Sequence, residues 1–202
     1  MKKTYGSFQS FWEQNRRLLV FLALLLAGVV GGVVIFRRAA SVPAVLASFF
    51  PQGVEATPGG LAAAWLRACL PVWLVLGVLF LTGLAVWGAP VAAAAPVFFG
   101  LGIGLGEAVC AARGADGLAM AALLILPGRL AAAAAVLPGC AESLRFSLQL
   151  ARQTVRRDAR GGGLLREGRL YCVRFIVFFG MAAAAGAVDV LFRLLFGPLF
   201  AA

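Results

Sequence analysis

Long apolar blocks without any charge constrain this chain more than any other feature of its sequence. The first block runs from Leu18 to Phe36 and contains no ionisable residue. A helix needs about 20 such residues to cross the ~30 Å of hydrocarbon in a bilayer. Further apolar blocks follow along the whole chain, and short charged stretches separate them. The pattern predicts an all-α, polytopic helical bundle that is integral to a membrane.

The composition supports this class of protein. Hydrophobic residues make up 62% of the 202 residues and charged residues 13%, whereas roughly a quarter of the residues in a soluble domain are charged. The net charge of +10 lies mostly in clusters of Arg and Lys beside apolar blocks. Such clusters set membrane topology and attract anionic lipid heads. We therefore expect the lipid bilayer, and not nucleic acid, as the partner of this charge.

Five transmembrane helices are expected in one membrane domain. Their approximate ranges are 18–36, 70–87, 91–106, 118–137 and 171–196. The stretch 39–68 is rich in Pro and Gly, so we interpret it as an outer loop with short interfacial helices, one of them around Leu61 to Trp65. Only Gly88-Ala89-Pro90 separates the second and third spans, which indicates a tight hairpin; one long broken helix is the alternative. Pro138-Gly139 is expected to end the fourth span.

Basic residues near the helix ends predict the orientation. They are concentrated before the first span and in residues 141–170, and cytoplasmic segments carry an excess of Lys and Arg. The N-terminus and residues 141–170 are therefore expected inside and the C-terminus outside. The apolar run after Arg17 is too long for a cleavable signal peptide, so a retained helix is expected. The aromatic stretch before it, from Tyr5 to Trp12, is predicted to lie in the interface.

Residues 141–160 form a predicted basic amphipathic helix on the cytoplasmic side. Apolar side chains recur at helical spacing from Leu144 to Val155, and basic ones lie on the opposite face. The basic face consists of Arg145, Arg152, Arg156 and Arg160. Two interpretations are open: a helix lying on the inner leaflet, which we favour, and a docking site for a cytoplasmic partner.

Three ionisable residues fall at or within membrane depth: Glu107, Arg129 and Asp189. Charges there are costly, so they face the bundle interior and find partners. The topology puts Arg129 and Asp189 at depths that the long Arg side chain can bridge, with Glu107 as the competing partner. We therefore predict a structural Arg129–Asp189 contact.

Small residues four positions apart, such as Gly28 and Gly32 or Gly100 and Gly104, allow helix backbones to approach closely. Packing within the chain explains them, and a homo-oligomer seam is the alternative.

The residue inventory argues against an enzyme. The chain has no histidine, and its four cysteines are scattered singly. No carboxylate pair or phosphate-binding loop is evident, so we expect no catalytic residues, no metal and no cofactor.

Several motifs resemble the stage II sporulation protein M family of bacterial membrane proteins, over nearly the whole length. They are the segments 11–17 before the first span, Gly88-Ala89-Pro90 with 98–102, Leu124-Ile125-Leu126-Pro127 leading to 147–150, and Asp189 with Gly197-Pro198-Leu199. Where Phe99 stands, a basic residue is common in that family, and polar amides are common where Gly128 and Arg129 stand.

The resemblance implies a non-enzymatic scaffold in the bacterial cell membrane. Members of that family hold a peptidoglycan-degrading complex that remodels septal wall and drives engulfment during sporulation. Extracytoplasmic peptidoglycan hydrolases are therefore the expected protein partners. The alternative is a membrane subunit of a small transporter or permease complex, since a Gly-rich bundle with buried charges is also compatible with transport.

Overall fold

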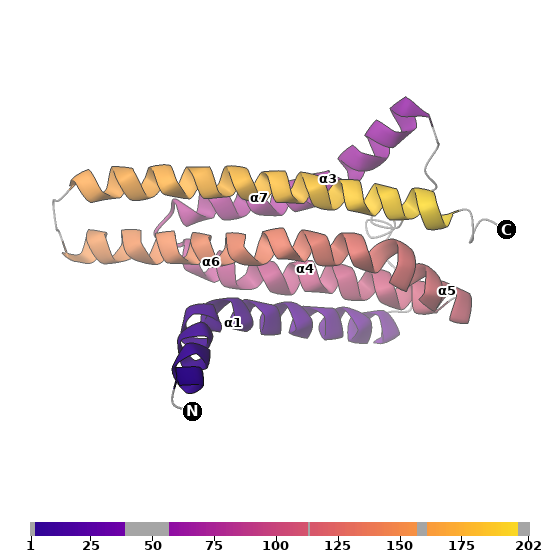
Figure 1. Ribbon diagram of the computed structural model, residues 1–202, viewed down its shortest axis with the longest axis horizontal. Coiled ribbons are helices and arrows are strands. Elements are labelled where there is room, and N and C mark those ends of the chain that lie inside the picture. Colours follow the sequence, from indigo (N-terminus) through magenta and orange to yellow (C-terminus); the bar gives the residue numbers. More distant parts are fainter. Residues whose placement is uncertain (1–2, 39–56, 113, 157–160, 198–202) are drawn as a thin grey trace.

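The computed structural model describes residues 3–38, 57–112, 114–156 and 161–197 (Figure 1). These residues form α1 (Lys3–Arg38), α3 (Pro58–Gly83), α4 (Gly88–Ala111), α5 (Ala115–Met120), the π-helical turn η1 (Ala121–Ile125), α6 (Leu126–Arg156) and α7 (Gly161–Phe196). Within this part of the chain, five helical segments are long and apolar enough to cross a membrane: Leu18–Arg38, Gly59–Gly83, Gly88–Ala111, Ala115–Thr154 and Arg166–Phe196. The all-helical class is confirmed, and five such segments are consistent with a multi-pass membrane protein.

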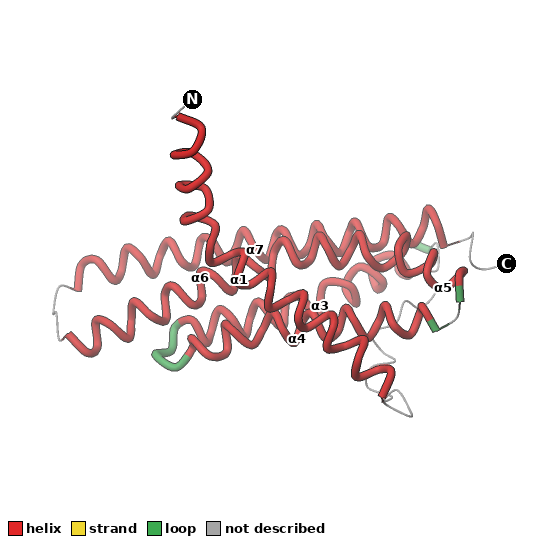
Figure 2. Tube along the Cα trace, turned by 90° about the horizontal axis from the view of Figure 1, so that it is seen from below, coloured by secondary structure: helices red, strands yellow, loops and turns green. Residues whose placement is uncertain are grey.

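The long helices run side by side along one axis (Figures 1 and 2). Helix α1 lies at one edge and packs mainly against α4, while α6 contacts α3, α4 and α7. The core therefore lies between α3, α4, α6 and α7, with α1 as an added outer helix. Phe21 and Leu25 of α1, Leu76 of α3, Val136 of α6 and Phe175 of α7 are all buried in this core.

Close backbone contact joins α1 to α4. A Cβ atom built on Gly28 or Gly32 would collide with the backbone of α4, and one on Gly100 or Gly104 would collide with the backbone of α1. Two glycine pairs at four-residue spacing thus face each other, as the spacing predicted. By contrast, a Cβ atom built on Gly102, Gly106 or Gly180 would meet nothing within 4 Å.

The outer surface of the bundle is apolar. Phe98 is 71% exposed and Ile176 is 70% exposed, and large aliphatic side chains are exposed on all five long helices. Water-soluble monomers rarely display apolar surface on this scale. This exterior matches the five-segment pattern of the sequence.

Helix α3 begins earlier than the sequence predicted. Residues 61–65 do not form a separate interfacial helix but belong to the first turns of α3. Thr57 caps the helix by accepting a hydrogen bond from the Gly60 N–H at 3.1 Å, and Pro58 occupies the first turn, where its missing N–H costs nothing. Trp65 then fastens this segment to α7, because its indole N–H donates to the Ala183 carbonyl at 3.0 Å. Residues 39–56 of the predicted outer loop lie outside the described residues.

The second and third apolar segments are two separate helices. Helix α3 ends at Gly83, the turn Leu84–Trp87 follows, and α4 begins at Gly88. Gly88 is required directly after this turn, at the start of α4, since a Cβ there would meet the Thr82 carbonyl. The predicted hairpin is therefore confirmed and the broken-helix alternative is wrong for this pair. The position of the turn was predicted wrongly, because Gly88-Ala89-Pro90 are the first residues of α4 and the turn is Leu84–Trp87.

Helix α6 does not end at Pro138-Gly139, where the sequence analysis ended the fourth span. It continues to Arg156 with Pro138 inside it. One proline removes one backbone hydrogen bond, whereas the residues on both sides of it are packed in the core, Val136 and Cys140 among them. The packing of α6 on α3 and α7 thus outweighs the free-energy cost of the hydrogen bond lost at Pro138.

Over its described part, residues 141–156, the predicted amphipathic helix 141–160 is the continuation of α6 and not a separate surface helix. Its buried face is also rotated from the predicted one: Ser143, Phe146 and Ser147 are buried, while Leu148 is exposed. Small hydroxyl side chains can be buried here because they find acceptors on α3 and the turn that follows it. The prediction failed because hydrophobicity alone does not reveal such acceptors.

The first turns of α1 bend away steeply from the rest of the helix, which runs along the bundle (Figures 1 and 2). Such an orientation suits a helix in the plane of a membrane surface. The stretch from Tyr5 to Trp12 falls in this N-terminal part, and its interfacial position stays a prediction.

Candidate functional site: a charged cluster between three helices

A π-helical turn lies directly before the candidate site, at the junction of α5 and α6. In η1, the Leu126 N–H donates to the Ala121 carbonyl, a wider turn than that of an α-helix. Pro127 explains it, because proline has no N–H to donate and its ring presses on the carbonyl four residues earlier. Turns of this kind occur frequently at functional sites. Gly128 and Arg129 follow directly.

Four charged side chains from three helices interact at this level. Asp189 and Arg193 of α7 form an ion pair with 2.7 Å between Oδ2 and a guanidinium nitrogen. Their side chains are only 9% and 18% exposed. Arg129 of α6 interacts electrostatically with both, and also with Glu107 of α4. The cluster therefore holds two carboxylates and two guanidinium groups.

Close packing brings α6 and α7 together in this cluster. A Cβ atom on Gly128 would lie 2.6 Å from Oδ1 of Asp189, so only glycine leaves room for that carboxylate. The glycine before Arg129 thus allows Asp189 to sit against the backbone of α6. This contact is what brings Asp189 within the electrostatic range of Arg129.

The three residues singled out from the sequence, Glu107, Arg129 and Asp189, are close enough to interact. Asp189, however, makes its short ion pair with Arg193, which the sequence analysis did not consider. Arg193 could have been found from the sequence, because it lies four residues after Asp189 and such positions are neighbours on a helix. A direct Arg129–Asp189 contact stays a prediction.

Two opposite pairs of charges balance each other in the cluster. Mutual neutralisation suits a structural role at a helix junction more than a proton relay, which needs an ionisable group able to change its charge. Three atoms depart from this pattern, because Oε1 of Glu107, Oδ2 of Asp189 and Nε of Arg193 are buried and have no hydrogen-bond partner within the described residues. Oδ2 of Asp189 still lies 2.7 Å from a guanidinium nitrogen of Arg193 in the ion pair. Oε1 of Glu107 therefore keeps acceptor capacity beside that pair.

A second polar group lies at the other end of the bundle. Tyr171 is about 18 residues from Asp189 along α7, which corresponds to ~27 Å. Its hydroxyl donates to the carbonyls of Leu79 and Phe80, at 3.2 and 3.0 Å. Ser143 donates to the Leu79 carbonyl at 2.8 Å, and Ser147 to that of Ala85 at 2.9 Å. Side chains of α6 and α7 thereby bind carbonyls in the last turns of α3 and in the turn that follows it.

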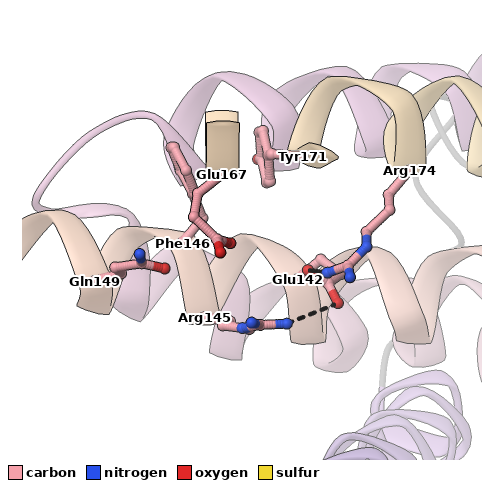
Figure 3. A pocket seen from close by; sticks show the side chains of 7 residues that line it. All are labelled: Glu142, Arg145, Phe146, Gln149, Glu167, Tyr171 and Arg174. Atoms are coloured by element: carbon pink, nitrogen blue, oxygen red, sulfur yellow. Dashed lines mark hydrogen bonds and ion pairs between the residues drawn. The ribbon is translucent and has the colours of Figure 1, made fainter. Parts of the chain in front are cut away.

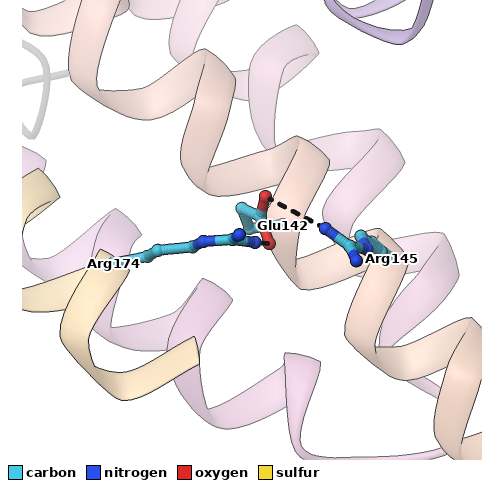
Figure 4. Close-up of polar contacts among 3 residues, drawn as sticks. All are labelled: Glu142, Arg145 and Arg174. Atoms are coloured by element: carbon cyan, nitrogen blue, oxygen red, sulfur yellow. Dashed lines mark hydrogen bonds and ion pairs between the residues drawn. The ribbon is translucent and has the colours of Figure 1, made fainter. Parts of the chain in front are cut away.

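Charged residues surround this polar group on its exposed side. Glu142 of α6 accepts a hydrogen bond from Arg174 of α7 at 2.6 Å, and Arg145 lies 3.9 Å from its other oxygen (Figure 4). A shallow hollow here has room for about one water molecule. It is lined by Glu142, Arg145, Phe146, Gln149, Glu167, Tyr171 and Arg174 (Figure 3). The ion pair ties α6 to α7.

The predicted basic face is only partly within the structure. Arg145 takes part in the Glu142 group and Arg152 is exposed. The side chain of Arg156 and the whole of Arg160 lie outside the described residues.

The cysteines of the bundle are all free thiols: Cys69, Cys110 and Cys140 are buried and Cys172 is exposed. Among the described residues, no group of three or more His, Cys, Asp or Glu side chains is placed to hold a metal ion.

Together the fold and its polar groups define a class: a helical bundle with five apolar segments, of the kind found in multi-pass membrane proteins. Comparison of the chain with protein-family models, with curated proteins and with solved structures gave no match.

Proposed function

We propose that this chain is a five-span protein of the bacterial cytoplasmic membrane, with its N-terminus inside and its C-terminus outside. The apolar exterior of the bundle supports a lipid environment. Trp87, 85% exposed in the turn between α3 and α4, suits an interfacial position. The basic residues near that end, which include Arg145, Arg169 and Arg174, support its placement in the cytoplasm.

Within that membrane the chain serves as a non-enzymatic scaffold that anchors a peptidoglycan-degrading complex. The sequence resemblance to the stage II sporulation protein M family supports this role, including septal wall remodelling and engulfment as the process. The hydrogen bonds of the buried polar side chains also support an anchoring role. Trp65, Trp73, Ser143, Ser147 and Tyr171 all donate to backbone carbonyls of a neighbouring helix or of the turn after α3.

Polar side chains that form hydrogen bonds between helices make a bundle rigid, and a rigid bundle suits an anchor. A transport path would need polar groups that face a substrate. Glu107, whose Oε1 has acceptor capacity left, is the residue that favours the transport alternative. The two functions therefore differ in an observable way, namely in whether the bundle moves a solute or holds a partner.

Cysteine crosslinking tests the scaffold. Ala63 and Leu66 are exposed near the start of α3, on the proposed outer side, and Thr154 is exposed at the opposite end of the bundle. In a Cys172→Ser background, Ala63→Cys should crosslink in cells to a protein with peptidoglycan-degrading activity in a zymogram. Thr154→Cys is the matched control and should not.

Absence of wall-degrading activity from the Ala63→Cys and Leu66→Cys adducts would contradict the scaffold proposal. Solute flux in proteoliposomes of the purified chain, abolished by Glu107→Gln, would favour the transport alternative instead.

A further inference from the structure

Helices α6 and α7 extend together beyond the turn between α3 and α4 (Figure 1). Ser147 marks the level of that turn, because it donates to the Ala85 carbonyl. Helix α6 continues from there to Arg156, about nine residues or ~13 Å farther. Helix α7 begins at Gly161 and passes this level before Tyr171, whose hydroxyl donates to the Phe80 carbonyl, five residues before Ala85 in the chain. We name the described side chains of this part, residues 148–154 and 166–170, the α6–α7 projection.

The base of the projection is held firmly. The rings of Phe146 and Tyr171 stack with centroids 4.6 Å apart, and Tyr171 also stacks on Phe80 of α3 at 5.5 Å. On the exposed side, the 2.6 Å ion pair between Glu142 and Arg174 joins the two helices. Such a base fixes the direction of the projection along the axis of the bundle.

The surface of the projection is polar and basic. Arg152, Thr154, Arg166 and Arg169 are exposed. Exposed large apolar side chains occur only where the projection meets the bundle, at Leu148 and Leu170. A helix that lies on a lipid surface needs an apolar face to insert, and the inward faces of these helices are used in packing α6 against α7. The described part of the projection thus stands in water and presents arginine.

We propose that the α6–α7 projection is a docking surface for an acidic segment of a cytoplasmic protein. Every basic residue from 145 to 174 is arginine and none is lysine. The guanidinium group is a planar fork that binds a carboxylate through two parallel hydrogen bonds. Because a rigid pair of helices carries these guanidinium groups, binding of a partner does not have to order a flexible loop. The proposal rests on the inward orientation proposed above, but not on the wall-degrading partners.

The experiment uses the full chain in nanodiscs of phosphatidylcholine, which has no net charge, and a fluorescein-labelled glutamate-rich peptide. Fluorescence anisotropy measures the Kd. The double variant Arg152→Gln/Arg166→Gln should weaken binding roughly tenfold or more. The control Arg37→Gln/Arg38→Gln removes the same charge at exposed positions at the far end of α1 and should change the Kd by less than about twofold.

Three outcomes would overturn the proposal. The first is an equal loss of affinity in both double variants, which would indicate attraction by net charge alone. The second is loss of peptide binding in nanodiscs that contain phosphatidylglycerol, because the arginines would then belong to anionic lipid. The third is tighter binding of a labelled oligonucleotide that depends on Arg152 and Arg166. Retained peptide binding in the phosphatidylglycerol nanodiscs supports it, and a failed hydrolase crosslink leaves this result unaffected.

Discussion

At Gly100, the absence of a Cβ atom lets the backbone of α4 touch that of α1 near Leu25 and Gly28. Two residues along the same helix, Gly102 has nothing within 4 Å of the position its Cβ would take. The same residue type therefore has opposite roles at neighbouring positions. Without hydrophobic driving force between helices in lipid, close packing of this kind is a main source of association.

Gly100→Val should push α1 away from α4 and destabilise the bundle by about 1–3 kcal/mol, the usual range for overpacking. Gly102→Val is the matched control, and it should leave the free energy of unfolding nearly unchanged. Unfolding by SDS titration in mixed micelles measures both. Equal effects of the two variants would show that α1 and α4 do not meet through this glycine.

In the charged cluster, Asp189→Asn should cost about 3 kcal/mol, because Arg193 and Arg129 then share a single carboxylate in a nearly dry site. Adding Arg193→Gln restores the balance of charge, with Glu107 opposite Arg129. The double variant should therefore recover much of the lost stability in the same SDS titration. Asp116→Asn, an exposed carboxylate in the first turn of α5, is the control and should change stability by a few tenths of a kcal/mol.

The partner of Asp189 is decided by the same cycle. Recovery with Arg193→Gln but not with Arg129→Gln would assign the ion pair to α7 itself and reject the Arg129–Asp189 contact predicted from depth. The predicted depth in the membrane identified Glu107, Arg129 and Asp189 as a group of interacting residues. It did not identify Arg193, because that residue lies near the end of an apolar block, where charged residues are common.

At the scale of helices, the number and order of the apolar segments follow from the sequence, but their ends do not. Hydropathy and proline positions ended the fourth span at Pro138 and started the second near residue 70. The structure carries both helices farther. The deciding contacts are long-range: Trp65 bonds to Ala183, and Ser143 and Ser147 bond to carbonyls more than 60 residues away. Local patterns cannot show such partners.

Side chains of α6 and α7 cap the end of α3, and a further prediction follows from this capping. Ser143 and Tyr171 both donate to the Leu79 carbonyl, so either can partly compensate for loss of the other. Ser143→Ala and Tyr171→Phe should each cost about 1 kcal/mol. The double variant should cost more than the sum, because it removes both side-chain donors from the Leu79 carbonyl. The free energy of unfolding in mixed micelles gives all three values.

Thr154→Ala serves as the control for this cycle, since Thr154 is exposed and its hydroxyl donates to Leu150 in its own helix. It should have little effect on stability. Strict additivity of Ser143→Ala and Tyr171→Phe would mean that the two hydroxyl groups do not share an acceptor.

For the whole molecule, the charged cluster and the polar group around Tyr171 form two layers, and the stretch 175–188 of α7 between them carries no charged side chain. One layer holds Asp189 and Arg193, and the other, ~27 Å away along α7, holds Tyr171 and the carbonyls at the end of α3. That separation is close to the ~30 Å thickness of a hydrocarbon core. With the apolar exterior between them, the two layers fit opposite boundaries of one bilayer. The proposed orientation then assigns the α6–α7 projection to the cytoplasm.

This assignment predicts opposite accessibility for two engineered thiols. In a Cys172→Ser background, where the remaining cysteines are buried, Ala63→Cys should react with a membrane-impermeant maleimide in intact cells. Thr154→Cys should react only after the membrane is permeabilised, because it lies on the projection. Labelling is measured by the gel shift of the tagged chain. Reaction of Thr154→Cys in intact cells would reverse the orientation, and reaction of both thiols from the same side would contradict an odd number of spans between the two positions. The turn at Leu84–Trp87 makes that number three, through α3, α4 and α6, so the experiment tests the hairpin and the orientation together.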